Sequence, residues 1–310
     1  MVKKQIIEFP HFTWIDIENP DATTMEDLGR EHELHPLDIS DTLSISHRSK
    51  VDIYPKYVFL VFLFPLYNRQ NREIESSEIN FFIGRNFLIT IHKGNLTVFK
   101  DFFHTFHISP DLRDRYTDRS PERLVYESLH KMLMYIFPMI DHLIEDCDDI
   151  EREIFSGKER RLISEILMLR RNIIDFRKIM QVHKNVIKKS SFYFKESALY
   201  VMKKTDIYFD NLTNYAKEIW DTLENLKERI EALQATNESQ ISFRLSDIMR
   251  TLTVISVVML PISSLAAIFS MDMINSTPLV GNPYGFWIVL AVMVVIVVSM
   301  VSYFRKKGWF

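Results

Sequence analysis

One carboxylate, Asp272, stands alone between two long apolar stretches of the sequence. No other residue from Thr251 to Phe304 carries a formal charge. A carboxylate accepts hydrogen bonds from the water shell of a hydrated cation and adds a negative charge that an amide lacks. Asp272 is therefore our candidate for capturing a hydrated cation. The alternative is a solvated acid that only marks the end of a helix.

The two apolar stretches cover about residues 251–271 and 286–304. Each has roughly 20 residues, which as a helix spans about 30 Å of hydrocarbon. The alternative for either stretch alone is a buried helix of a soluble protein. Trp287 and Tyr303 mark the ends of the second stretch as interfacial anchors. Basic residues precede the first stretch and follow the second, so the positive-inside rule predicts two cytoplasmic termini and an outward-facing Asp272.

The first apolar stretch carries hydroxyl and small side chains at helical spacing. One face holds Ser246, Met249, Leu252, Ser256, Leu260, Ser263 and Ala267, and it continues to Ser270. Such a face suits a narrow water-filled path with apolar constrictions. Close packing of helices through small residues is the alternative. Because one helix cannot enclose a pore, the pore hypothesis requires several copies of the chain around this helix.

The rest of the chain must position this hairpin. Residues 1 to about 100 read as α/β, with a strand in "FTWIDIENP", a helix over 21–34, and strands near 57–64, 77–83 and 87–92. Residues 120–243 read as helices, interrupted mainly at Pro138 and Gly157. From about 205 to 243 a heptad seam holds Leu212, Ala216, Ile219, Leu223, Leu226, Ile230 and Leu233. It predicts a multi-helix stalk, or alternatively a long helix packed against its own domain.

Composition excludes several classes of protein. The net charge of −3 gives no sign of a general nucleic-acid binder, and a single cysteine, Cys147, excludes an internal disulfide. The first residues lack the apolar core of a secretory signal. No catalytic triad, HExxH or phosphate-binding loop is present, so the sequence predicts no enzyme. His104 and His107 could share a helix face, but without an acidic or cysteine partner nearby they make a poor metal site.

Two long segments resemble the CorA family of divalent-cation channels. They are "SDIMRTLTVISVVMLPISSLAAIFSMDM" and "YGFWIVLAVMVVIVVSMVSYFRKKGWF", joined by a short loop, and "WIDIENPDATTMEDLGREHELHPLDISDTLSISHRSKVDIYPKYVFLVF" is similar to that family's cytoplasmic domain. The resemblance covers essentially the whole chain. It implies a homopentameric funnel with an α/β/α head, a stalk helix continuous with the first membrane helix, and a peripheral second helix.

The resemblance also assigns roles to residues. The family's Gly-Met-Asn signature, which meets hydrated Mg²⁺, is Ser270-Met271-Asp272 here. Met249 and Leu252 match an apolar constriction and Leu260 a second narrowing, while Ser246 replaces an asparagine and Ser263 a threonine. Arg305, Lys306 and Lys307 match a basic collar, or serve only as surface anchors. Asn211, beside Asp210, replaces an aspartate that bridges Mg²⁺ between heads; Glu73, Glu75 and Glu78 are the candidate partners. The acidic helix 141–153 would gather cations loosely, or is simply solvated.

We therefore predict an α+β cytoplasmic head over residues 1–204, a stalk helix over 205–250 and a transmembrane hairpin over 251–310. The expected function is a passive channel in the inner or plasma membrane, with Mg²⁺ the favoured cargo and Co²⁺ or Ni²⁺ also considered. The expected partners are other copies of the chain in a pentamer and the lipid bilayer, and no nucleic acid. The alternatives are a proton-coupled transporter of zinc or another transition metal, and a non-conducting membrane-anchored metal sensor.

Overall fold

The computed structural model describes residues 2–44, 48–111, 120–156, 159–197, 200, 205–270 and 284–309. The chain divides into two compact units, Met1–Ala235 and Thr236–Phe310. One helix, α8 (Thr205–Phe269), begins in the first unit and ends in the second. It starts where the stalk helix was expected to start and continues past residue 250 without a break.

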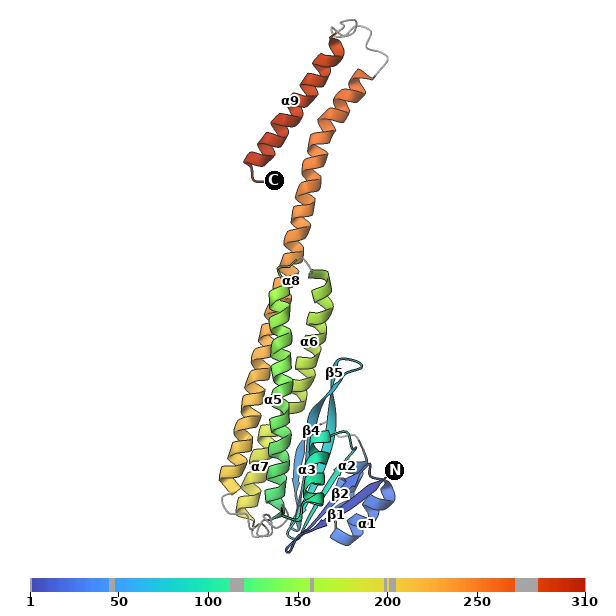
Figure 1. Ribbon diagram of the computed structural model, residues 1–310, viewed down its shortest axis with the longest axis vertical. Helices are drawn as coiled ribbons and strands as arrows, with labels where there is room; N and C mark the ends of the chain where they lie inside the picture. The colour runs from blue at the N-terminus through green and yellow to red at the C-terminus, as the bar shows by residue number, and fades with distance from the viewer. Residues whose placement is uncertain are drawn as a thin grey trace. The chain divides into compact units, whose positions relative to one another are not determined.

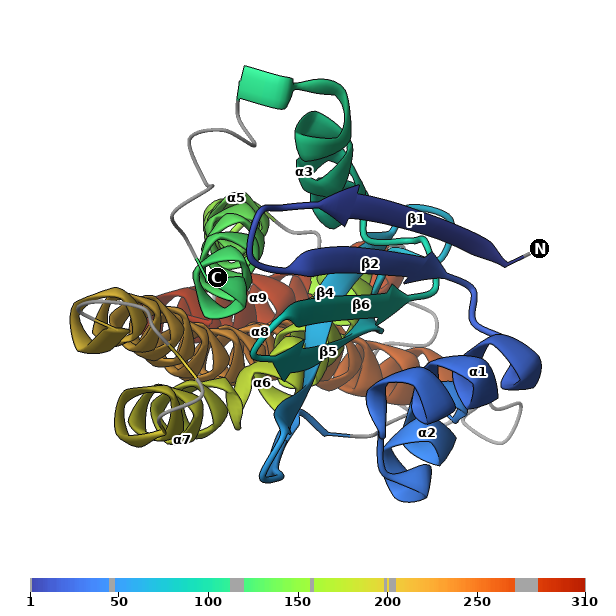
Figure 2. The ribbon, with the colours of Figure 1, turned by 90° about the horizontal axis from the view of Figure 1, so that it is seen from below.

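The first unit is built on a six-stranded sheet in the order β1-β2-β6-β5-β4-β3 (Figure 2). The strands are β1 (Lys3–Glu8), β2 (Thr13–Glu18), β3 (Lys50–Ile53), β4 (Tyr57–Asn68), β5 (Glu73–Gly84) and β6 (Phe87–His92). Only the β2–β6 pair is parallel; all other neighbours are antiparallel. The carboxyl ends of β2 and β6 therefore meet at one edge of the sheet, where the loops after Glu18 and His92 begin.

Helices cover both faces of the sheet, which confirms the predicted α/β/α head. Two short helices, α1 (Ala22–His32) and α2 (Pro36–Leu43), lie over one face, which has its own small core with Met25, Leu28 and Phe82. The other face packs against α3 (Thr97–Ile108), α5 (Pro121–Glu153), α6 (Glu159–Met180), α7 (His183–Glu196) and the first half of α8. Figure 1 shows these helices beside one another.

Local chemistry explains where the two short helices sit. Asp21 caps α1 by accepting a hydrogen bond of 2.9 Å from the backbone N–H of Thr24. In α2, the carboxylate of Asp38 accepts hydrogen bonds from the hydroxyls of Tyr54 (3.0 Å) and Tyr57 (2.7 Å). Asp38 is 1% exposed, so burial raises the pKa of its carboxyl. The two tyrosines thus fix α2 on the sheet.

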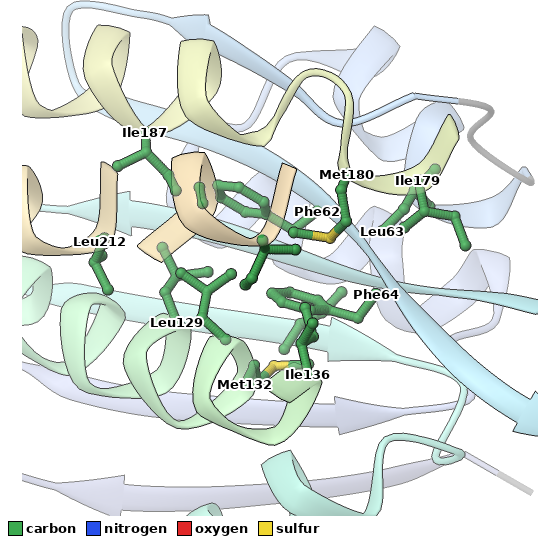
Figure 3. Close-up of a cluster of buried hydrophobic side chains, with 14 of the residues drawn as sticks. Phe62, Leu63, Phe64, Leu129, Met132, Ile136, Ile179, Met180, Ile187 and Leu212 are labelled. Carbon is green, nitrogen blue, oxygen red and sulfur yellow. The ribbon is translucent and has the colours of Figure 1, made fainter. Parts of the chain in front are cut away.

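The larger core contains the complete heptad seam of α8. Its seven residues are all buried, from 0% exposure at Leu212 to 8% at Leu233. They belong to one cluster with residues of β4, α5, α6 and α7, part of which Figure 3 shows. The seam therefore packs inside one subunit, and the alternative of a long helix packed against its own domain is correct for this stretch. It does not supply the contact between copies that we had expected from it.

Several elements differ from the sequence prediction. Strands β1 and β3 and helices α2 and α3 were not predicted, and β4 and β5 each extend to 12 residues. Pro138 does not interrupt the helical region, because it lies inside the 33-residue helix α5. Packing of Ile136 and Ile140 into the core outweighs the one backbone hydrogen bond that the proline removes. Gly157 lies outside the described residues.

Candidate ion pathway

The second unit holds two helices that are long and apolar enough to cross a membrane: the end of α8, and α9 (Gly285–Lys306). Along α9 the less exposed side chains form a single stripe at spacings of three and four. The stripe consists of Gly285, Val289, Met293, Ile296, Val297, Met300 and Phe304. The aromatic anchors Trp287 (64% exposed) and Tyr303 (58%) lie off this stripe.

Helix α8 has a matching stripe. Val254 is 2% exposed, and Val258, Pro261, Ile262 and Leu265 are half-buried. These positions recur every three or four residues and so occupy one face of the helix. Since both helices belong to one compact unit, we assign the two stripes to their mutual contact. This face was missed in the sequence analysis, although its large apolar side chains were a signal for it.

The residues expected to line a pore lie on the opposite face of α8. At about 100° per residue, Met249, Leu252, Ser256, Leu260 and Ser263 centre roughly half a turn away from Val254. Their side chains, like those of Ser246 and Ala267, are exposed in the single chain; Leu260, for example, is 68% exposed. The structure thus brings all seven predicted residues onto one uncovered face.

Two hydroxyl groups near this face donate hydrogen bonds to backbone carbonyls of their own helix. Thr253 donates to the carbonyl of Met249 at 2.7 Å, and Ser264 donates to the carbonyl of Leu260 at 2.9 Å. Once the O–H is used in this way, the lone pairs of each hydroxyl oxygen remain available to water. Ser270, the last described residue of this segment, is exposed and follows the end of α8 at Phe269. Met271 and Asp272 lie outside the described residues.

The basic residues after the second span lie at the carboxyl end of α9. Arg305 and Lys306 occupy its last turn, where positive charge interacts favourably with the helix dipole. Lys307 caps the helix, and its ammonium lies 5.5 Å from the ring centre of Tyr303. All three side chains are exposed. This geometry fits either a collar or an anchor at the membrane surface.

The five candidate regulatory residues of the head have different surroundings. Asp210 is exposed, whereas half-buried Asn211 donates from its amide to the hydroxyl of Tyr126 at 3.4 Å. Glu73 pairs with Arg171 and Glu75 accepts from Asn68. Glu78 is buried and accepts from Asn80. Within the described parts of the chain, no three His, Cys, Asp or Glu side chains come together as a metal site.

The acidic helix segment 141–153 is partly neutralised within the subunit. Arg229 of α8 reaches Asp148 at 2.6 Å and also pairs with Glu151, and Arg152 pairs with Asp149. Asp146, on the same segment, is exposed to solvent. His104 and His107 both point to solvent from α3, and the ring of His107 stacks on that of Phe103.

The comparisons with known proteins agree with this arrangement. The family described as CorA-like Mg²⁺ transporter protein matches residues 10–306. The cobalt/magnesium transport protein CorA of Thermotoga maritima is 26% identical over 298 residues, which cover 96% of this chain and 83% of that protein. The solved CorA magnesium transporter of Methanocaldococcus jannaschii superposes with a TM-score of 0.81 at 20% identity, over 98% of this chain and 94% of that one.

A further solved structure resembles part of the chain. The ZntB cytoplasmic domain of Vibrio parahaemolyticus covers 76% of this chain and 89% of that one, with a TM-score of 0.61 at 12% identity. At such identities the two solved structures establish the fold alone.

An α/β/α head and two helices long and apolar enough to cross a membrane fit the class of membrane transport proteins to which the matching family belongs. The family match makes this specific, because it spans nearly the whole chain: the protein belongs to the CorA-like Mg²⁺ transporter family. The predicted resemblance, the fold class and the absence of an enzymatic role are thereby confirmed.

Proposed function

We propose that the chain forms a homopentameric, passive channel for hydrated divalent cations, with Mg²⁺ the favoured cargo. The uncovered face of α8 lines the pore, and α9 lies on the outside against lipid. The pentamer sits in the inner or plasma membrane with both termini in the cytoplasm. Family membership supports the cargo, since relatives in this family carry names that refer to magnesium and cobalt transport.

The observation that carries the proposal is the two-sided character of α8. Val254 and its neighbours form an apolar stripe of low exposure, which we assign to the contact with α9. The opposite face carries Ser256, Ser263 and other small or polar side chains that no described part of the chain covers. A membrane helix gains nothing from exposing hydroxyls to lipid. Enclosing that face among five copies would give these hydroxyls water and an ion to contact.

Along this face apolar side chains alternate with hydroxyl side chains. Met249 and Leu252 would form a constriction near the inner membrane surface, and Leu260 a second narrowing further out. Rings of apolar side chains can close a pore by excluding water. The hydroxyls of Ser256 and Ser263 lie around Leu260 in sequence and would contact the water shell of the passing ion.

At the outer mouth, five copies of Asp272 would form the capture ring together with Ser270 and Met271. For a ring radius of about 6 Å in a water-like dielectric, five carboxylates attract a divalent ion by roughly 7 kcal/mol and repel one another by roughly 5 kcal/mol. Both figures are unscreened upper values. The balance favours an occupied ring at neutral pH, and protonation of the carboxylates in acid weakens it.

Cysteine substitution tests the pore face directly. The only natural cysteine, Cys147, is buried, and burial raises the pKa of its thiol to about 11, so it will react slowly with thiol reagents. Ser256→Cys and Ser263→Cys should be modified by a small charged methanethiosulfonate, with loss of divalent-cation uptake and protection by Mg²⁺. Val254→Cys is the control on the opposite face and should keep its uptake. Equal block at all three positions would contradict the assignment of the pore face.

A further inference from the structure

The carboxyl end of α9 carries three adjacent cations, Arg305, Lys306 and Lys307, whose side chains are all exposed. The described residues from 236 onward hold only two carboxylates, and both are on α8. Among the residues that the structure describes, none of the three cations has an acidic partner. Their positive charge is therefore available to an anion from outside the chain.

A Schellman turn fixes the end of this helix. The backbone N–H of Gly308 donates to the carbonyl of Arg305 at 3.1 Å, and that of Trp309 donates to the carbonyl of Phe304 at 3.0 Å. Gly308 adopts a φ of +70°, which glycine does without strain. The indole of Trp309 packs against the ring of Phe304, with 5.4 Å between the ring centres. The cations therefore project from a structured helix end rather than from a loose tail.

The position of Phe304 gives the direction in which the cations project. Phe304 is 9% exposed and is the last residue of the α9 stripe that we assigned to the contact with α8. At about 100° per residue, Lys306 projects nearly opposite to Phe304, and Arg305 and Lys307 lie on either side of Lys306. Lys307 still has a helical backbone, with φ of −82° and ψ of −2°, so the same spacing applies to it. The cations thus fan out over the side of α9 away from α8, whereas a collar around a pore lined by α8 would need them on the side towards it.

Two hydroxyl groups lie one turn before Lys306 on the same side of the helix. Ser302 and Tyr303 precede Lys306 by four and three residues, and both side chains are exposed. The ammonium of Lys307 lies 5.5 Å from the ring centre of Tyr303, a cation–π contact that keeps this tyrosine beside the cations. Hydroxyl and ammonium groups donate hydrogen bonds, and the bonds are strong when the acceptor is an ionised phosphate. The surface thus combines positive charge with hydrogen-bond donors, as the binding of a phosphodiester requires.

We propose that this surface binds the headgroup phosphate of an anionic phospholipid in the cytoplasmic leaflet. The binding residues are Ser302, Tyr303, Arg305, Lys306 and Lys307. Since α9 is long and apolar enough to cross a membrane, its end places these residues at the depth of the headgroups. The acyl chains of the same lipid lie along exposed apolar side chains below Lys306, such as Val295 (61–65% range excluded, 63% exposed). Anionic lipids give this leaflet a negative surface potential that attracts clustered lysines and arginines beside a span.

The inference rests on the proposed placement of α9 in the membrane with a cytoplasmic carboxyl end. It depends neither on ion conduction nor on the number of copies in the assembly. Its test counts bound lipids and needs no ion flux, so failure of the channel proposal would leave the lipid site unaffected.

Native mass spectrometry of the full-length protein in mild detergent counts the lipids that stay bound. Phosphatidylglycerol and phosphatidylcholine with the same acyl chains are added in equal amounts, without divalent cations. The wild type should retain phosphatidylglycerol in excess. Lys306→Gln should lower the ratio of retained phosphatidylglycerol to phosphatidylcholine about fivefold, which is the contribution of one cation near a membrane surface, and Lys306→Arg should keep the ratio. Ser302→Ala should lower the retention of both lipids and leave their ratio unchanged, because both contain the phosphate.

Arg250→Gln is the matched control, because it removes a cation of the other membrane helix that already pairs with Asp247 at 3.6 Å. It should leave the ratio of the two lipids unchanged. Equal retention of both lipids by the wild type would overturn the proposal. So would an equal loss in Lys306→Gln and Arg250→Gln, which would mean that only the diffuse charge of the surface attracts the lipid. Retention of neither lipid would overturn the placement of α9 in the membrane as well.

Discussion

Acidification should destabilise the head through one histidine, His183, at the start of α7. Its side chain is completely buried and lies against the rings of Phe62 (5.3 Å between centres) and Phe64 (5.4 Å). Neither ring nitrogen has a well-formed hydrogen bond. Burial lowers the pKa of His183 to about 4, and the nearby backbone groups of Ile179 and Leu63 oppose this shift only in part. The folded head therefore keeps this ring neutral.

The sign and size of the effect follow from the two pKa values. In the unfolded chain the ring gains a proton as the pH falls below 6.5, whereas in the folded head it stays neutral down to about pH 4. The unfolded state thus binds more protons in this window, and stability falls with falling pH by about 1.4 kcal/mol per unit. The full loss is about 3 kcal/mol, of which about 2 kcal/mol is reached at pH 5.

The assay is thermal unfolding of the full-length chain in mild detergent at pH 7.5 and pH 5, for the wild type and His183→Met. Methionine is similar in size, carries no charge and packs well against aromatic rings. A difference of 2 kcal/mol corresponds to a Tm difference of about 4–8 °C for a unit of this size. The wild type should lose that much more Tm on acidification than the variant. Comparing the two cancels the titration of other groups.

The control is His104→Met, at an exposed histidine of α3, which should lose as much Tm on acidification as the wild type. If His183→Met also loses as much as the wild type, the reasoning is wrong: the charged ring must then find water or a hydrogen-bond acceptor inside the folded head.

The remaining predictions concern the pore, the regulatory position, the head and the assembly. Asp272→Asn should keep the fold, weaken the capture of divalent cations and flatten the pH dependence of that capture. Asp272→Lys should nearly abolish uptake. The measurement is flux as a function of cation concentration, and equal apparent affinities in the wild type and both variants would make Asp272 a bystander. Asn211→Asp should increase inhibition by internal Mg²⁺, and an unchanged Mg²⁺ dependence of flux would remove this position from any metal bridge. Asn172→Leu should lower the free energy of unfolding by about 3 kcal/mol. Buried Asn172 accepts a hydrogen bond from the N–H of Ile74 (3.1 Å) and donates one to the carbonyl of Arg72 (2.9 Å). A loss below 1 kcal/mol would argue against a stabilising role for these two hydrogen bonds. Native mass spectrometry in mild detergent should show a pentamer, and a stable monomer or dimer would count against it.

The predicted pore residues lie on one exposed face of α8, because hydroxyl and small residues at helical spacing are a local signal; that this face lines a pore stays a prediction. The same kind of signal misled us for the heptad seam. Leu212, Ile219 and the other seam residues have to be buried, but spacing alone does not say whether the partner is the same chain or another copy. The structure shows that α5, α6 and α7 cover them.

Glu78 shows why the head sites were harder to predict. It was grouped with Glu73 and Glu75 as an acid that could reach a neighbouring copy. Alternation along β5 places Glu78 on the same face as Asn80 and Phe82, the face that α1 and α2 cover. Which face is covered depends on contacts between distant parts of the chain. A polar pair at alternate positions of an apolar strand was the available signal, and it was missed.

Uptake into proteoliposomes tests passive conduction of divalent cations most directly. Initial rates of Mg²⁺, Co²⁺, Ni²⁺ and Zn²⁺ uptake should be measured with and without a pH gradient, and with the Ser256→Cys variant before and after thiol modification. We predict Mg²⁺ uptake that follows the ion's own electrochemical gradient, does not change with the pH gradient, and is lost on modification. Zinc uptake driven by the proton gradient would identify a coupled transporter instead, and no flux of any of the four ions would identify a non-conducting sensor.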